Sequence, residues 1–258
     1  MKDRKRIAII SDIHGNCIAL KTVLDDIENQ DIDSVICLGD IATLGPCPRE
    51  TVRMIKNLSC PCILGNHEQS LLHPNNLDQY GIDEMILKES VHWCIKKLDS
   101  EDFTFFRSFV STYTLDLGEN LKMLCYHGSP FSTIEAILPD SNNEAIQRLL
   151  DLDDDINIVV GGHTHFQLYR KYGEKIIVNP GSVGYAFVNP ALSKHSPSFL
   201  PKAEYAVVEV CKKNISVELK SLNYDIDELE SLVNNSDLPI KSWWLDEISR
   251  IRINLSKY

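Results

Sequence analysis

The N-terminal third of this 258-residue chain alternates short, largely apolar runs with segments that are expected to be helical. The apolar runs are residues 6–10, 34–38 and 62–64, and the helical segments between and after them are residues 16–28 and 49–58. Strands with apolar residues at successive positions are buried on both faces. This order therefore predicts a mainly parallel sheet that is covered by helices on both sides.

The rest of the chain adds further strands and helices to this beginning. We expect helices at residues 83–98, 100–109, 144–150, 225–233 and 242–253, and strands at residues 112–117, 121–126, 157–160, 167–170, 176–178, 204–210 and 215–219. The predicted fold class is α/β, a two-sheet β-sandwich flanked by helices with extra C-terminal helices. We expect one domain over residues 1–258, with a core at about 5–220 and a helical addition at about 224–255.

Charge and hydropathy exclude several classes of function. Lys and Arg number 26 and Asp and Glu number 37, so the formal net charge is −11, and a long nucleic acid is not an expected partner. Bound cations can still make one pocket positive, which leaves small phosphorylated ligands open. No apolar run approaches the roughly 20 residues of a membrane span, and residues 7–10 are too short for a secretory signal. We therefore expect a cytoplasmic protein with no membrane partner.

Polar residues follow the predicted strands, and five of the eight histidines lie among them. The segments are Asp12-x-His14, Gly39-Asp40, Gly65-Asn66-His67-Glu68, His127-Gly128 and Gly161-Gly162-His163-Thr164-His165. Ligands gather at the carboxyl ends of strands in open α/β sheets. Carboxylates, imidazoles and one amide, with no thiolate, suit hard or borderline cations such as Mn, Fe or Zn. A short, rigid Asp at a strand end is able to bridge two such cations.

These motifs, in this order and followed by Asn179-Pro180-Gly181-Ser182-Val183-Gly184, resemble the calcineurin-like metallophosphoesterases. The likeness is greatest to their small bacterial and archaeal phosphodiesterase branch. It covers about residues 7–184, with a weaker fit as far as about residue 219.

The resemblance implies a set of site residues and a pair of divalent metal ions (Mn, Fe, Zn or Ni). One ion would be held by Asp12, His14, Asp40 and His165, and the other by Asp40, Asn66, His127 and His163. By the same resemblance, a hydroxide shared by the two ions attacks phosphorus in line and His67 is the general acid. Asn66 and Glu68 complete the implied catalytic set, and Glu68 stands where the common motif has Asp. Asn179 and Ser182 are expected to shape the surroundings of the ions or the phosphate rim.

The predicted function is metal-dependent hydrolysis of small phosphodiester or nucleotide-type substrates, for example dinucleoside polyphosphates. A noncatalytic scaffold on the same fold and a protein serine/threonine phosphatase are the alternatives. Because the chain keeps His67 and every ligand position, we favour the enzyme. Residues 185–201 should border the pocket, and Leu44 stands where many relatives carry Tyr. An apolar stripe with Trp243 and Trp244 is expected to pack on the sandwich, with a lid or dimer surface, and so a homo-oligomer, as the alternative.

Overall fold

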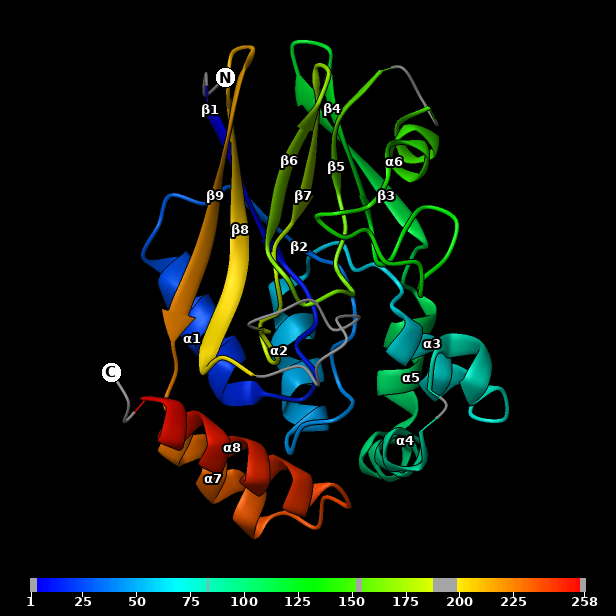
Figure 1. Cartoon of the computed structure of the whole chain (residues 1–258), viewed down its shortest axis with the longest axis vertical. Coiled ribbons are helices and arrows are strands. Elements are labelled where there is room, and N and C mark those ends of the chain that lie inside the picture. Colours follow the sequence, from blue (N-terminus) through cyan, green and yellow to red (C-terminus); the bar gives the residue numbers. More distant parts are fainter. Residues whose placement is uncertain (1–3, 83, 152–154, 188–198, 256–258) are drawn as a thin grey trace.

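Two β-sheets lie face to face at the centre of the fold (Figure 1). The computed structural model of the chain describes residues 4–82, 84–151, 155–187 and 199–255. The four-stranded sheet has the order β2 (Ser34–Cys37), β1 (Arg4–Ile10), β8 (Lys202–Cys211) and β9 (Asn214–Asn223). The five-stranded sheet has the order β3 (Thr112–Gly118), β4 (Leu121–Tyr126), β5 (Ile156–Val160), β7 (Lys175–Asn179) and β6 (Leu168–Tyr172).

Helices lie outside the two sheets. They are α1 (Cys17–Glu28), α2 (Pro48–Leu58), α3 (Asn66–Leu72), the 3-10 turn η1 (Leu77–Tyr80), α4 (Met85–Lys97), α5 (Ser100–Arg107), α6 (Asn143–Leu150), α7 (Ile226–Asn235) and α8 (Lys241–Leu255). Apolar residues of α1 and α2 pack against the four-stranded sheet, and those of α6 pack against the five-stranded sheet. The predicted two-sheet sandwich flanked by helices is thus confirmed.

The strand β1 shows why its sequence is apolar at successive positions. Ile7 and Ile9 point into the core between the two sheets, whereas Ala8 and Ile10 pack against the helices on the other side. All four side chains are fully buried. Each buried isoleucine stabilises the fold by about 1.5–3 kcal/mol relative to an exposed one. The end of β1 is consequently a rigid platform for the residues that follow it.

The prediction of a mainly parallel sheet is wrong, because both sheets are mixed. Three of the seven strand pairings between the described strands are parallel and four are antiparallel. The antiparallel pairings come from β8, which returns beside β1, and from the hairpins β3–β4, β6–β7 and β8–β9. Local hairpins need only a short turn, whereas each parallel pair requires a long crossover.

The predicted third strand at residues 62–64 is also wrong. Cys62 and Ile63 form only isolated parallel bridges, to Cys37 and Val110 respectively. The chain then turns directly into α3, a helix that the sequence did not predict. The Glu68 carboxylate accepts a hydrogen bond from the Gly65 backbone N–H and so caps the start of this helix. The helix expected from residue 83 begins at Met85, and residue 83 lies outside the described residues.

The predicted C-terminal helices are present and pack against the body of the protein (Figure 1). Trp244 in α8 is only 3% exposed and lies in an apolar cluster with Ile18, Tyr185 and Leu229. The expected packing role of this stripe is thus confirmed for Trp244, while the single-domain boundaries stay a prediction. Within the described residues no helix has the length and apolar character that crossing a bilayer requires.

Candidate metal centre

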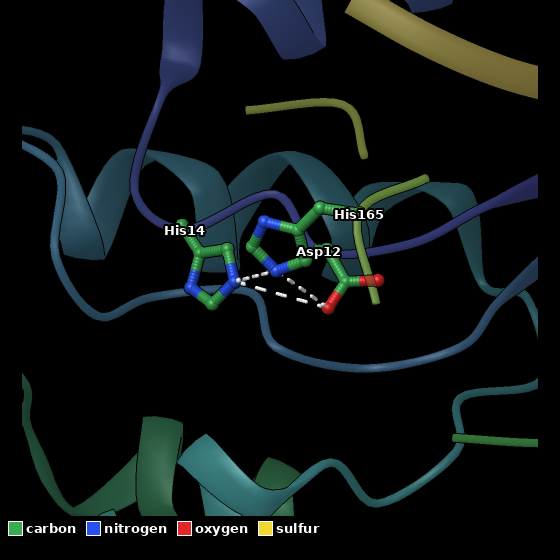
Figure 2. Close-up of side chains that lie close together, drawn as sticks. All are labelled: Asp12, His14 and His165. Carbon is green, nitrogen blue, oxygen red and sulfur yellow. Dashed lines mark hydrogen bonds and ion pairs between the residues drawn. The ribbon is translucent and has the colours of Figure 1, made fainter. Parts of the chain in front are cut away.

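Three side chains from distant parts of the sequence meet beyond the ends of β1 and β5. Figure 2 shows Asp12, His14 and His165 pointing toward one another. The Asp12 Oδ1 atom lies 3.3 Å from His165 Nε2 and 3.8 Å from His14 Nε2. The two Nε2 atoms are 3.0 Å apart. One carboxylate oxygen and two imidazole nitrogens thus converge on one point, as ligands of a borderline cation do.

A second group lies beside the first and is built around Asp40, His127 and His163. Their ligand atoms lie within 4.8 Å of one another, and Asp40 Oδ2 is 3.2 Å from His127 Nε2. The same Asp40 oxygen lies 3.9 Å from His14 Nε2 in the first group. Asp40 therefore stands between the two groups, where the sequence predicted a bridging carboxylate.

Asn66 joins the second group through its side-chain oxygen. Its Oδ1 atom lies 3.0 Å from His127 Nε2, and its Nδ2 atom donates to the Tyr80 carbonyl oxygen at 2.9 Å. The amide is thus held with its oxygen toward the histidines. All seven predicted metal ligands consequently lie in one continuous cluster.

The backbone of this cluster is strained. Five of the seven predicted ligands have positive φ angles, namely Asp12 (54°), His14 (48°), Asp40 (56°), His163 (67°) and His165 (55°). Residues other than glycine rarely adopt this left-handed region, at a cost of about 1–3 kcal/mol each. Such strain persists only where the surrounding structure enforces it, and it concentrates at ligand-binding and active sites.

The hydrogen bonds of Asp12 leave one of its oxygens without a partner. Oδ2 accepts from Ser11 Oγ at 2.6 Å and from the His163 backbone N–H at 2.9 Å. Oδ1 is buried and has no hydrogen-bond partner among the described residues. Unsatisfied buried carboxylate oxygens are costly. A cation bound between this oxygen and the facing imidazoles would satisfy it, so the residues present fit a metal ion.

Two glycines allow the chain to approach Asp40 closely. Gly39 has φ +98°, and a Cβ atom there would lie 2.6 Å from the Ile63 carbonyl oxygen. A Cβ atom on Gly65 would lie 2.1 Å from Asp40 Oδ1. No larger residue fits at either position, which explains the glycine before Asp40 and the glycine before Asn66.

The electrostatics of the cluster favour ionised carboxylates. Burial raises the pKa of Asp40, but the charges of His127, His67 and His14 outweigh burial and hold it well below its usual range. Burial lowers the pKa of His127, but the Asp40 carboxylate beside it dominates and raises the pKa to about 10. Burial and the neighbouring His127 charge lower the pKa of His163 to about 4. Metal ligands must be deprotonated, so a cation would take the place of the proton on His127.

His67 lies at the edge of the cluster. It is 8% exposed, and its backbone N–H donates to Asp40 Oδ1 at 2.9 Å. Its Nε2 atom is 4.0 Å from Asp40 Oδ2, and its Nδ1 atom is 2.6 Å from Thr43 Oγ1. Thr43 was not predicted, because nothing in the sequence of residues 41–46 indicates which side chain turns inward.

Glu68 lies beneath the Asp40 loop and bonds its backbone. Its carboxylate accepts hydrogen bonds from the backbone N–H groups of Asp40 (2.7 Å), Ile41 (2.7 Å) and Gly65 (3.1 Å). The side chain thus fixes the backbone that carries Asp40. Both carboxylate oxygens are used in this way, and the ring of His67 is held by Thr43 instead.

Asn179 and Ser182 brace the loops that carry the predicted ligands. Asn179 Nδ2 donates to the Gly162 carbonyl oxygen at 2.7 Å, and Ser182 Oγ donates to the Asp12 carbonyl oxygen at 2.6 Å. These contacts match the expected supporting role around the metal ligands rather than a place on a phosphate rim. Residues 188–198 of the segment expected to border the pocket lie outside the described residues.

Comparisons with known proteins identify a matching family model and relatives with the same fold. The family model for the calcineurin-like phosphoesterase superfamily domain matches residues 6–213. An uncharacterized protein of Methanocaldococcus jannaschii is 28% identical over 267 residues, which are 95% of this chain and 97% of that protein. A metallophosphoesterase structure from Sphaerobacter thermophilus has a TM-score of 0.73 and 24% identity, covering 96% of this chain and 98% of its own. A hypothetical protein from Pyrococcus horikoshii has a TM-score of 0.75 and 24% identity, covering 95% and 97%. The two solved structures share the fold of this chain.

Proposed function

This chain belongs to the calcineurin-like phosphoesterase superfamily, and we propose that it hydrolyses small phosphodiester or nucleotide-type substrates with two divalent cations. The observation that carries the proposal is the buried, unpartnered Oδ1 atom of Asp12, faced by the Nε2 atoms of His14 and His165. The proposed ligands are those of the two groups described above, with Asp40 shared between them.

Each part of the site has a distinct role in this proposal. When bound, the cations would lower the pKa of a shared water that attacks phosphorus and would neutralise charge on the phosphoryl oxygens. Asp40 keeps the two ion positions next to each other. His67 presents its Nε2–H group to the leaving oxygen and donates a hydrogen bond to it, which stabilises the negative charge that develops there. Glu68 holds the Asp40 loop in place.

The chemistry of the substrate follows from the charges of the chain. With a net charge of −11, the chain as a whole repels a polyanion. Attraction to a phosphate group therefore depends on the cations at the centre, which favours small phosphorylated substrates. A manganese-supplemented screen of monoesters, diesters, cyclic nucleotides and dinucleoside polyphosphates tests the proposed substrate class.

Replacing His67 separates an enzyme from a noncatalytic scaffold. His67→Ala should lower turnover of an aryl phosphodiester by roughly 10²–10⁴-fold, with the metal content retained. The neighbouring exposed His73→Ala variant is the matched control and should keep full turnover. Loss of metal from His67→Ala would instead make His67 a ligand, since it lies within reach of His14 and Asp40. Unchanged turnover in this variant would contradict the proposed role of His67 at the leaving oxygen.

A further inference from the structure

The Thr43 hydroxyl faces His67 from the loop that follows Asp40. Thr43 is fully buried, and its Oγ1 atom lies 2.6 Å from His67 Nδ1. A buried hydroxyl needs an acceptor for its hydrogen. Among the described residues, His67 Nδ1 is the hydrogen-bond partner of this hydroxyl.

This contact decides which nitrogen of the ring carries hydrogen. In a neutral imidazole one nitrogen donates and the other accepts. If Nδ1 donated to Thr43 Oγ1, the hydroxyl hydrogen would have no described acceptor. If the hydroxyl donates to Nδ1, both groups are satisfied and the hydrogen of the ring lies on Nε2. A carboxylate partner would impose the opposite arrangement, because it only accepts.

The carboxylate nearest in sequence to His67 is committed elsewhere. Both oxygens of Glu68 accept from backbone N–H groups of Asp40, Ile41 and Gly65. The Nε2 atom of His67 lies on the side of the cluster, 4.0 Å from Asp40 Oδ2. The ring is thus held at Nδ1 by Thr43, and the backbone of His67 is held by the Asp40 carboxylate.

We infer that Thr43 is a positioning residue: its hydroxyl holds neutral His67 as the Nε2–H tautomer, which donates a hydrogen bond to the leaving oxygen of the substrate and keeps its hydrogen. This inference rests on the proposed function, because it concerns how His67 stabilises the leaving oxygen of the proposed reaction. The hydroxyl itself does not touch the substrate. Its effect is to fix the orientation and the tautomer of the ring.

The kinetic test compares esters that differ only in the leaving group. A phenolate leaves less readily than a p-nitrophenolate and depends more on a hydrogen donor. With the phenyl and p-nitrophenyl esters of thymidine 5′-phosphate, Thr43→Val should lower kcat on the phenyl ester about 10–100-fold, with a smaller loss on the p-nitrophenyl ester. KM and metal content should stay unchanged, and Thr43→Ser should restore kcat. In a His67→Ala background, Thr43→Val should cost nothing further.

Equal losses on both esters, or the same loss in the His67→Ala background, would overturn the role of Thr43. These results are distinct from a failure of the proposed function. If His67→Ala shows the leaving-group dependence and Thr43→Val does not, the role of His67 at the leaving oxygen is supported and the inference on Thr43 is wrong. If the parent hydrolyses neither ester, the proposed activity on these diesters fails, and Thr43 is then judged by spectroscopy alone.

The spectroscopic test does not depend on activity. In metal-free protein labelled with ¹⁵N-histidine, NMR at pH 8 should show His67 protonated at Nε2, with its signals assigned from their loss in His67→Gln. Thr43→Val should shift the ring toward a mixture of tautomers, and Thr43→Ser should retain the parent spectrum. Protonation at Nδ1 in the parent, or an unchanged tautomer in Thr43→Val, would overturn the inference.

Discussion

The Nε2 atoms of His14 and His165 lie 3.0 Å apart, and both face the unpartnered Oδ1 atom of Asp12. Two neutral imidazoles can place only one hydrogen between these nitrogens, and the carboxylate oxygen then stays unsatisfied. A cation at the centre would bind all three atoms at once. The folded protein should therefore be markedly more stable with metal than without it.

Metal removal tests this expectation. Protein treated with a chelator should unfold at a lower temperature, and manganese should restore the unfolding temperature. At 100 times the dissociation constant, binding adds about 2.7 kcal/mol to the free energy of unfolding. Thermal unfolding of the parent and of Asp12→Asn, each with and without manganese, measures the effect. A manganese-dependent rise of the same size in Asp12→Asn would contradict the assignment of Asp12 as a ligand.

Asp40→Asn should lower the metal content of both ion positions. The carboxylate lies within 4 Å of His14 in one group and of His127 in the other, and an amide is a weaker bridging ligand. Elemental analysis of purified variants measures the metal equivalents. Asp246→Asn, an exposed position on α8, is the control and should match the parent. Two full equivalents in Asp40→Asn would rule out the bridge.

Glu204 on β8 should make stability depend on pH. Burial raises the pKa of this carboxyl from 4.5 to about 7. The folded state thus binds the proton more tightly than the unfolded state. Stability is therefore highest below pH 4.5, falls as the pH rises toward 7 and is level above that. Glu204→Gln should remove this loss, and its advantage should grow between pH 5 and pH 8 to at most about 3 kcal/mol.

Urea unfolding of the parent and Glu204→Gln at several pH values checks the prediction. Glu174→Gln, in the exposed turn between β6 and β7, serves as the control and should follow the parent at every pH. An advantage of Glu204→Gln that is constant with pH would show that this carboxyl titrates normally in the folded protein.

Trp244→Phe should destabilise the protein and slow the reaction. The Trp244 indole donates to the Leu44 carbonyl oxygen at 2.9 Å, and Leu44 directly follows Thr43. Losing a buried hydrogen bond costs about 1–3 kcal/mol. Trp243→Phe removes a similar ring from the same cluster, where Trp243 is only partly buried, and should have a smaller effect. Chemical denaturation and kcat measurements on both variants test this prediction. Equal losses of stability and kcat in the two variants would exclude the Leu44 contact as the cause.

The sequence predicted those site residues whose side-chain type suits a metal ligand and whose position is at the end of an apolar strand. Asp12 and Asp40 follow two apolar runs, and because β1 and β2 are parallel neighbours, their ends deliver both carboxylates to one place. The fold class followed from the same alternation of strands and helices. The pairing of β8 beside β1 was not predictable in this way, because a partner about 200 residues away leaves no local signal.

The supporting residues of the site were harder to predict from the sequence. The direction of Thr43 depends on how the Asp40 loop meets α3, and Glu68 caps the start of α3. Glu68 was expected in the catalytic set, yet its task is set by three backbone N–H groups that converge from two segments of the chain. The meeting of these N–H groups depends on the tertiary structure, and the hydrophobic periodicity of the sequence does not indicate it.

Anomalous diffraction from crystals grown with manganese tests the central claim most directly. We predict two manganese peaks roughly 3.5–4 Å apart, with the Asp40 carboxylate between them. One peak should lie against Asp12, His14 and His165, and the other against His127 and His163. The absence of peaks at these residues, or a single ion that Asp40 does not contact, would contradict the account.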